Sequence, residues 1–154
     1  MKKQLQLAIG KTENTKHKLL LSILLETGAK LSEIINLRWC DLSTSEIRII
    51  RNDGKERIMP ISRSIQVLLR SYAKEYDLDF LRNNEHYIFG GVKPYSKKAV
   101  SLAVSKAGER IGIKLTPQDF TNAYIQYLQK SNMPLEKKIY LSGYKSVSSL
   151  IRLV

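Results

Sequence analysis

Apolar positions recur at helical spacing in the first part of the chain. The run from Leu19 to Leu25 is apolar except at one serine and is followed by Gly28, a residue type that often adopts the left-handed conformation that ends a helix. Ser32 is a candidate cap for a second helix over residues 33–39, which carries its own apolar stripe. The pattern therefore predicts two helices joined by a short turn, with Lys30 on that turn.

Alternation of apolar and polar residues replaces helical spacing between Glu46 and Ser62. Ile47 and Ile49 alternate with a basic residue, and Asn-Asp-Gly at 52–54 is a turn sequence, so this stretch predicts a β-hairpin. Residues 86–91 offer a short third strand, which would give a small three-stranded antiparallel sheet. Three basic residues flank the turn and are expected to make its tip a basic finger: Arg51, Lys55 and Arg57.

Helix start and stop signals recur in the rest of the chain. Ser62 and Ser96 each precede a stretch with one apolar face. Thr116 precedes a proline and lies three residues before an aspartate, which predicts a capping box. Pro134 is expected at the first position of a helix that ends at Gly143. Together these signals predict one mostly helical α+β domain over residues 1–154.

Charge points to an anionic partner. The 154 residues include 26 Lys and Arg against 14 Asp and Glu, a formal net charge of +12, and nucleic acid is the first candidate for such a chain. A membrane partner is not expected, because the longest apolar run is far shorter than the roughly 20 residues that a span needs. The basic start has no uninterrupted apolar stretch or small-residue cleavage site, so a cytoplasmic location is expected.

Metal and cofactor chemistry find no support in the sequence. One cysteine and two distant histidines, His17 and His86, give no zinc-ligand spacing, so neither a metal nor a cofactor is predicted. Cys40 cannot form an internal disulfide, and its apolar neighbours predict that it is a small buried side chain.

Four segments in this order resemble the catalytic domain of the tyrosine recombinase (phage integrase) family. The segment LLETGAKLSEIINLRWCDL is similar to the opening pair of helices, and GKERIMPIS is similar to the hairpin. The third, YSKKAVSLAVSKAGERIGIKLTPQDF, is similar to the approach to the active site, and YLSGYKS is similar to the segment before the nucleophile. The resemblance implies the recombinase catalytic fold and phosphoryl transfer by a tyrosine that attacks a DNA phosphate.

The catalytic positions implied by this resemblance are mostly substituted. Lys30 stands where the family has its first arginine, and Lys55 matches the family lysine. Gln118 and Thr121 replace the histidine and arginine of the His-x-x-Arg motif, so the proton shuttle and the second guanidinium are missing. Two further substitutions complete the set: Tyr144 stands where the family usually has His or Trp, and Leu153 falls where the spacing places the nucleophilic tyrosine.

DNA contact requires less than catalysis does, namely cations and polar groups directed at phosphates. If the family fold holds, six basic residues are expected on the DNA-facing side: Lys30, Arg51, Lys55, Arg57, Lys97 and Lys98. About ten residues precede the matching region, so the N-terminal core-binding domain of the family is expected to be absent.

The sequence therefore predicts a duplex-DNA-binding protein that resembles a recombinase and does not cleave strands. Without a nucleophile the covalent route has no first step. One alternative is an active recombinase with a relocated tyrosine, Tyr140 or Tyr144, or with a tyrosine supplied by another chain. Another is a protein-interaction module that contacts a second copy or an intact recombinase through residues 146–154.

Overall fold

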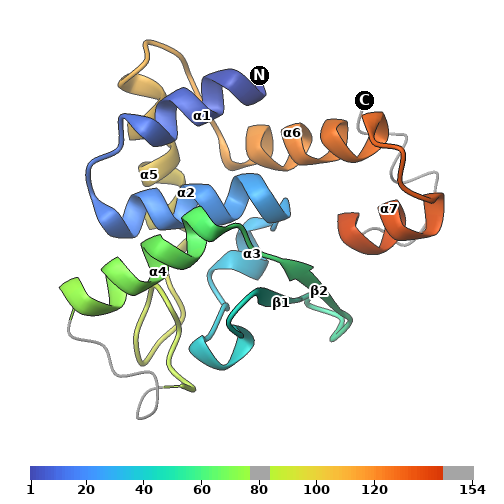
Figure 1. Cartoon of the computed structure of the whole chain (residues 1–154). Coiled ribbons are helices and arrows are strands. Elements are labelled where there is room, and N and C mark those ends of the chain that lie inside the picture. The colour runs from blue at the N-terminus through green and yellow to red at the C-terminus, as the bar shows by residue number, and fades with distance from the viewer. Residues whose placement is uncertain (77–83, 144–154) are drawn as a thin grey trace.

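The computed structural model describes residues 1–76 and 84–143. Its centre is helix α2 (Thr15–Thr27), which has buried residues all around its circumference, from Leu19 to Thr27. Helices α1, α4, α5 and α6 pack against α2 (Figure 1). A helix that is apolar on every side is stable only in such a surrounding, so α2 fixes the positions of its four neighbours.

The helices begin and end largely at the predicted residues. Helix α4 (Arg63–Glu75) and helix α5 (Lys97–Glu109) are capped by the hydroxyl groups of Ser62 and Ser96, which accept backbone N–H bonds of 3.2 Å each. Helix α6 (Pro117–Lys130) starts at the predicted capping box. Helix α7 (Leu135–Ser142) ends at Gly143 as predicted, but Pro134 is its N-cap and not its first helical residue.

The start of the second predicted helix is one correction. Helix α3 covers only Leu31–Ile34 and its N-cap is Lys30, not Ser32. The Glu33 carboxylate accepts a bond of 2.8 Å from the Lys30 N–H, so a side chain three residues ahead fixes the start of the helix. The chain then enters a short 3-10 helix, η1 (Trp39–Asp41).

Helix α1 (Lys2–Gly10) was not predicted from the sequence. It buries only Leu5 and Ala8, so its apolar stripe is two residues long and is interrupted by glutamines. Its position is decided by packing on α2 and α5. Weak periodicity of this kind carries little local signal, and tertiary contacts determine the outcome.

The sheet has two strands, not three. Strands β1 (Glu46–Ile50) and β2 (Glu56–Pro60) form the predicted antiparallel hairpin, with Ile47 opposite Met59. Residues 86–91 form only isolated bridges, in which Tyr87 pairs with Arg38 and with Gly91. Gly91 adopts a φ of 79°, and the Tyr87 N–H donates to the Gly91 carbonyl at 2.7 Å. This tight turn prevents an extended strand there.

Cys40 is exposed and not buried as predicted. The 3-10 helix η1 directs Trp39 and Asp41 inward on either side of it. In the described ranges, no helix combines the length and the apolar character that a membrane span requires.

Gly28 follows the end of α2 and packs closely against α6. Its φ is 65°, and a Cβ added there would lie 2.6 Å from Cδ1 of Tyr124 on α6. Gly112 shares the conformation, with a φ of 75°, but no heavy atom lies within 4 Å of a Cβ at that position. Comparing an alanine substitution at Gly28 with one at Gly112 therefore separates the cost of backbone strain from the cost of disturbing the packing of α6 against the end of α2.

Replacement of Gly28 by alanine is expected to lower the free energy of unfolding by about 2–4 kcal/mol, because left-handed strain and overpacking add. Gly112→Ala carries only the strain and is expected to cost about 1–2 kcal/mol. Urea denaturation monitored by circular dichroism measures both. Equal losses in the two variants would contradict the close packing of Tyr124 on Gly28.

Candidate nucleic-acid interface

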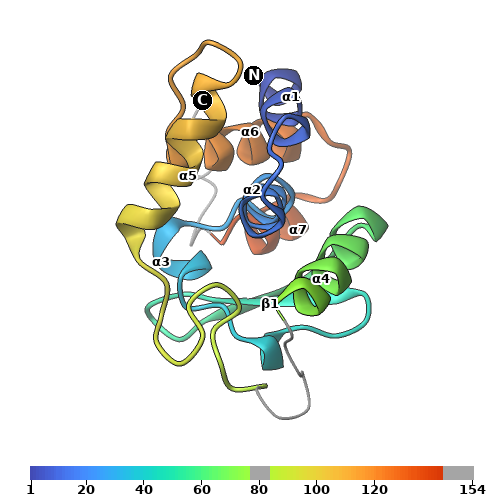
Figure 2. The ribbon, with the colours of Figure 1, turned by 90° about the vertical axis from the view of Figure 1, so that its left-hand side faces the viewer.

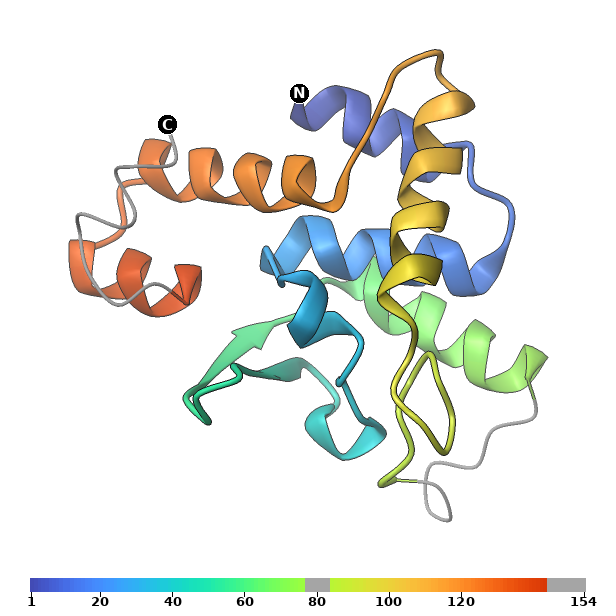
Figure 3. The same ribbon diagram turned by 180° about the vertical axis from the view of Figure 1, so that it is seen from behind.

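Three elements converge on a shallow groove of about 400 Å³. The groove lies between α3, the start of α5 and the start of α6, which come together in the view of Figure 3. It brings together Lys30, Gln118 and Thr121, which the sequence singled out from separate segments. The described residues that line it are Lys30, Leu31, Ser32, Lys97, Ser101, Thr116, Pro117, Gln118 and Thr121.

The start of α6 supplies the polar floor of the groove. The Asp119 carboxylate accepts bonds from the N–H and the hydroxyl of Thr116, at 2.8 and 3.2 Å. Gln118 is exposed, and its amide donates to Oδ1 of Asn122 at 2.9 Å. Thr121 is 5% exposed, so this position offers the groove a short hydroxyl side chain in place of a long cation.

Two lysines supply charge at the rim. Lys30 is the exposed N-cap of α3, and Lys97 is the exposed first residue of α5. Lys98 is also exposed at the start of α5, but it is not among the lining residues. The structure thus places two of the six predicted DNA-contacting cations at the groove itself.

A buried ion pair lies behind Lys30. Nη1 of Arg57 is 2.9 Å from one Glu33 carboxylate oxygen, and Nη2 is 3.3 Å from the other. Both side chains are 3% exposed. The oxygen bonded to Nη2 is also the one that accepts the Lys30 N–H, so the pair ties β2 to the turn that presents Lys30.

The position of Arg57 corrects the expectation that it is a surface cation of the hairpin tip. Residues two apart on a strand share a face, and Arg57 lies on the face of the buried Met59, opposite Ile49. A Cβ at Gly143 would be 2.5 Å from its Nη1, so the guanidinium also contacts the end of α7. The period-2 pattern of the hairpin was the signal that could have revealed this.

Glu33 was missed as a site residue. The sequence analysis included it only as part of a segment similar to the family. Its position, three residues after Lys30, is nevertheless the one at which a capping box places a carboxylate. Its pairing with a residue 24 positions away has no local signal.

Tyr124 packs beside this ion pair. Burial raises the pKa of Tyr124 to about 12, while the charge of Arg57 acts in the opposite direction. The phenol therefore stays protonated throughout the physiological range. It serves as a packing surface for Gly28 and not as an ionised nucleophile.

The tip of the hairpin carries fewer unpaired charges than the sequence suggested. Arg51 forms an ion pair of 3.0 Å with Asp53, and the same aspartate accepts the Lys55 N–H at 3.0 Å. Lys55 is exposed and does not line the groove. Its role as the retained family lysine stays a prediction.

Of the tyrosines considered as relocated nucleophiles, Tyr140 lies on α7 and is 48% exposed. Its hydroxyl oxygen accepts a bond of 2.7 Å from the Ile58 N–H, which joins α7 to the edge of β2. Tyr144 and Leu153 lie outside the described residues.

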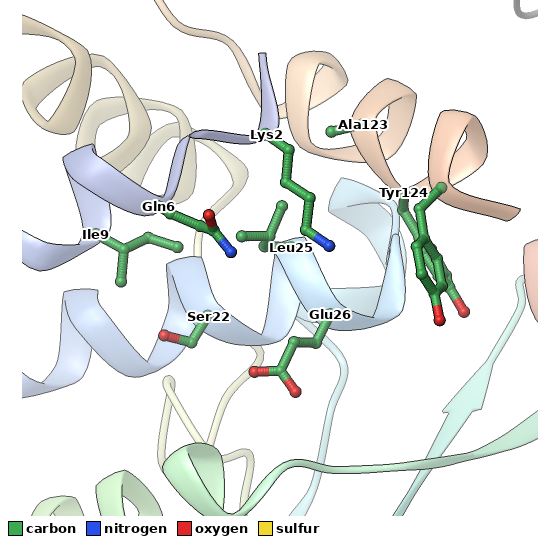
Figure 4. Close-up of a pocket in the computed structure, with 9 residues that line it drawn as sticks. Lys2, Gln6, Ile9, Ser22, Leu25, Glu26, Ala123 and Tyr124 are labelled. Carbon is green, nitrogen blue, oxygen red and sulfur yellow. The ribbon is translucent and has the colours of Figure 1, made fainter. Parts of the chain in front are cut away.

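A second hollow, of about 450 Å³, lies between α1, α2 and α6 (Figure 4). Lys2 points into it, with Nζ 4.9 Å from the centre of the Tyr127 ring. None of the predicted site residues is among the described residues that line this hollow. It is therefore separate from the groove.

The lining residues of the groove offer hydrogen-bond donors to an anion. Two ammonium groups, an amide and hydroxyls can donate hydrogen bonds to phosphate oxygens. Among its described lining residues there is no imidazole, guanidinium or carboxylic acid to move a proton or to bind two oxygens at once. Across the described ranges, no three His, Cys, Asp or Glu side chains are grouped so that they could hold a metal.

Comparison with known proteins gives one consistent result. The model of the phage integrase family matches residues 1–152. Tyrosine recombinase XerA of Pyrococcus horikoshii is 24% identical over 149 residues, covering 92% of this chain and 50% of XerA. XerC of Pseudomonas putida is 25% identical over 133 residues, covering 84% of this chain and 44% of XerC. The chain spans about half the length of the curated relatives it matches.

Solved structures agree with the fold. The crystal structure of XerA recombinase superposes with a TM-score of 0.83 at 20% identity, covering 98% of this chain and 57% of the XerA chain. XerH site-specific recombinase bound to its difH substrate, in a pre-cleavage complex, gives a TM-score of 0.80 at 17% identity, covering 99% of this chain and 47% of that chain.

The buried pair behind Lys30 gives a testable expectation. Glu33→Ala leaves the Arg57 guanidinium buried without its carboxylate and removes the bond to the Lys30 N–H, so it should lower the free energy of unfolding by about 3–5 kcal/mol. Glu56→Gln, which removes only the long exposed contact of 3.9 Å with Arg48, should change it by less than about 0.5 kcal/mol. Chemical denaturation compares the two variants, and a loss for Glu33→Ala as small as the control would show that the pair is dispensable.

Proposed function

The chain belongs to the phage integrase family, and on that premise we propose that it binds duplex DNA through the groove face without cutting the strand. The observation that carries the proposal is the groove itself. Its rim holds the cations Lys30 and Lys97, and its floor holds the uncharged side chains of Gln118 and Thr121. DNA binding needs the two lysines. Strand cleavage would need a charged group and a proton-transfer group at the positions of Gln118 and Thr121.

The binding half of the proposal is supported by charge and by relatives. The net charge is +12, and phosphate contacts by lysine supply most of the affinity of non-specific DNA binding. XerH, which shares the fold, was solved bound to its difH substrate. Lys55 and Lys98 are exposed near the hairpin turn and at the start of α5, where they can extend the contact beyond the groove.

The absence of cleavage is supported by what replaces the family's catalytic groups. A lysine at position 30 has a charge but no planar fork for two phosphate oxygens. Gln118 cannot exchange a proton near neutral pH. Each lost catalytic donor typically costs on the order of a hundredfold to a thousandfold in rate, and losses within one site act together. Leu153 stands at the nucleophile spacing.

The alternative with a relocated tyrosine has less support. The hydroxyl of Tyr140 is held against the backbone of β2, where it has a structural role in joining α7 to the hairpin. A reacting tyrosine would have to leave that bond to approach a phosphate. The other alternative, contact with a second copy or an intact recombinase through residues 146–154, falls outside the described residues.

DNA binding is tested by fluorescence anisotropy of labelled duplex DNA at several salt concentrations. Lys30→Gln with Lys97→Gln should weaken binding and make the log-log salt slope shallower by about 2, because each phosphate contact contributes roughly 0.9. Lys130→Gln with Lys137→Gln is the matched control. Lys130 is the last residue of the 14-residue α6, so it lies roughly 20 Å from the groove. Equal effects of the two variants would refute a groove-centred contact.

Strand cleavage is tested with a nicked duplex that traps a covalent protein–DNA adduct. The unmodified protein is expected to form no adduct on denaturing gels under conditions in which it binds the duplex. A covalent adduct would overturn the proposal. Its loss in Tyr140→Phe, but not in Tyr144→Phe, would identify the attacking residue.

A further inference from the structure

Basic residues also gather on a face of the molecule that the groove does not occupy. We define the α2–α5 cluster as Lys16 and His17 of α2 together with Lys106 and Arg110 at the end of α5. Figure 2 looks at this face, with α2 seen from its N-terminal end and α5 beside it. The elements around the groove face the viewer in Figure 3, a quarter turn away.

Contacts within the protein hold two members of the cluster in place. Nη1 of Arg110 donates to Oγ1 of Thr12 at 3.3 Å, and Thr12 is itself buried and bonded to the Ala8 carbonyl. Nζ of Lys16 lies 4.4 Å from the centre of the Tyr95 ring. These contacts orient the cations but neutralise none of them, because their partners are uncharged.

Two carboxylates lie next to the cluster in the sequence, Glu13 before α2 and Glu109 beside Arg110 at the end of α5. The ion pairs of the described ranges all join residues between Glu33 and Arg57, on the hairpin side of the molecule. None of the three permanent cations of the cluster pairs with a carboxylate in those ranges. Like charges held close together repel one another, and an anion bound among them would relieve that repulsion.

The pKa of His17 responds to these neighbouring cations. Burial lowers its pKa below the usual value, and the positive charges of Lys16, Arg110 and Lys106 lower it further. His17 is therefore mostly neutral at pH 7. An anion bound beside it would oppose the three cations and favour the protonated form.

We propose that the α2–α5 cluster is a second surface for the phosphate backbone of DNA. The cations come from two helices and are spread along a surface, an arrangement suited to a row of phosphates. Helix α5 connects the cluster to the groove: Lys97 starts this helix of 13 residues and Lys106 lies in its last turn, a rise of roughly 14 Å. The inference rests on the proposed function for the identity of the polyanion, but it concerns a different surface.

The phosphates can come from two sources, which the number of bound duplexes distinguishes. A single duplex that leaves the groove and follows α5 would reach the cluster within roughly 14 Å. A second duplex would reach it independently, and one protein molecule would then bridge two DNA molecules.

The test variant is Lys106→Gln with Arg110→Gln, compared with Lys130→Gln and Lys137→Gln, which remove the same charge elsewhere. Anisotropy is measured with a 30-base-pair duplex at several salt concentrations. If one duplex spans both surfaces, the cluster variant weakens binding severalfold and flattens the salt slope by about 2. If a second duplex binds, capture of a labelled duplex by an immobilised one is lost in the cluster variant and kept in the control.

Nuclear magnetic resonance of the histidines gives a readout that does not depend on affinity. The chain has two histidines, so His86 serves as an internal reference for effects that are not specific to the cluster. Duplex DNA is expected to raise the pKa of His17. Proton uptake on binding then makes the affinity increase as the pH falls through the raised pKa of His17 in the complex, and His17→Gln should abolish that increase.

The two proposals fail separately. Unchanged duplex affinity, unchanged bridging and an unchanged pKa of His17 in the presence of DNA would overturn the second surface, even if the groove variant loses binding. Loss of binding in the cluster variant alone, with the groove variant unaffected, would sustain the cluster and overturn the groove as the contact.

Discussion

Burial of α2 is the constraint on which the rest of the structure depends. Its apolar residues face every direction, so the chain gains stability only when other helices cover it on several sides. Helices α5 and α6 provide two of those contacts, and their N-termini meet beside the turn that follows α2. The same packing that forms the core therefore also sets the position of the groove.

The turn at Gly28 converts this packing into a functional arrangement. The left-handed glycine ends α2 where Tyr124 leaves no space for a side chain, and Lys30 follows as the cap of α3. The carboxylate of Glu33 then bonds both the turn and Arg57. A buried pair of this kind contributes little net stability compared with apolar packing, but it is costly to break, so its clear effect is to hold the hairpin and the turn in one geometry.

The hairpin side of the molecule and the α2–α5 cluster differ in how their charges are balanced. On the hairpin side, arginines are paired with Asp41, Asp53 and Glu33, and these pairs serve turns and strands. On the α2–α5 side, the cations are oriented by a hydroxyl and an aromatic ring. The basic residues therefore fall into two groups. Those on the hairpin side form internal ion pairs, and those of the α2–α5 cluster stay available to an anionic partner.

The sequence by itself determined most helices, the hairpin, the caps at Ser62, Ser96 and Thr116 and the family, because these follow from local spacing and from short-range hydrogen bonds. It also located Lys30, Gln118 and Thr121, but as isolated positions in separate segments. Only the tertiary structure decided that they line one groove, that Arg57 pairs with Glu33 and that α1 exists. Each of these depends on contacts between residues far apart in the chain, for which periodicity and capping rules carry no information.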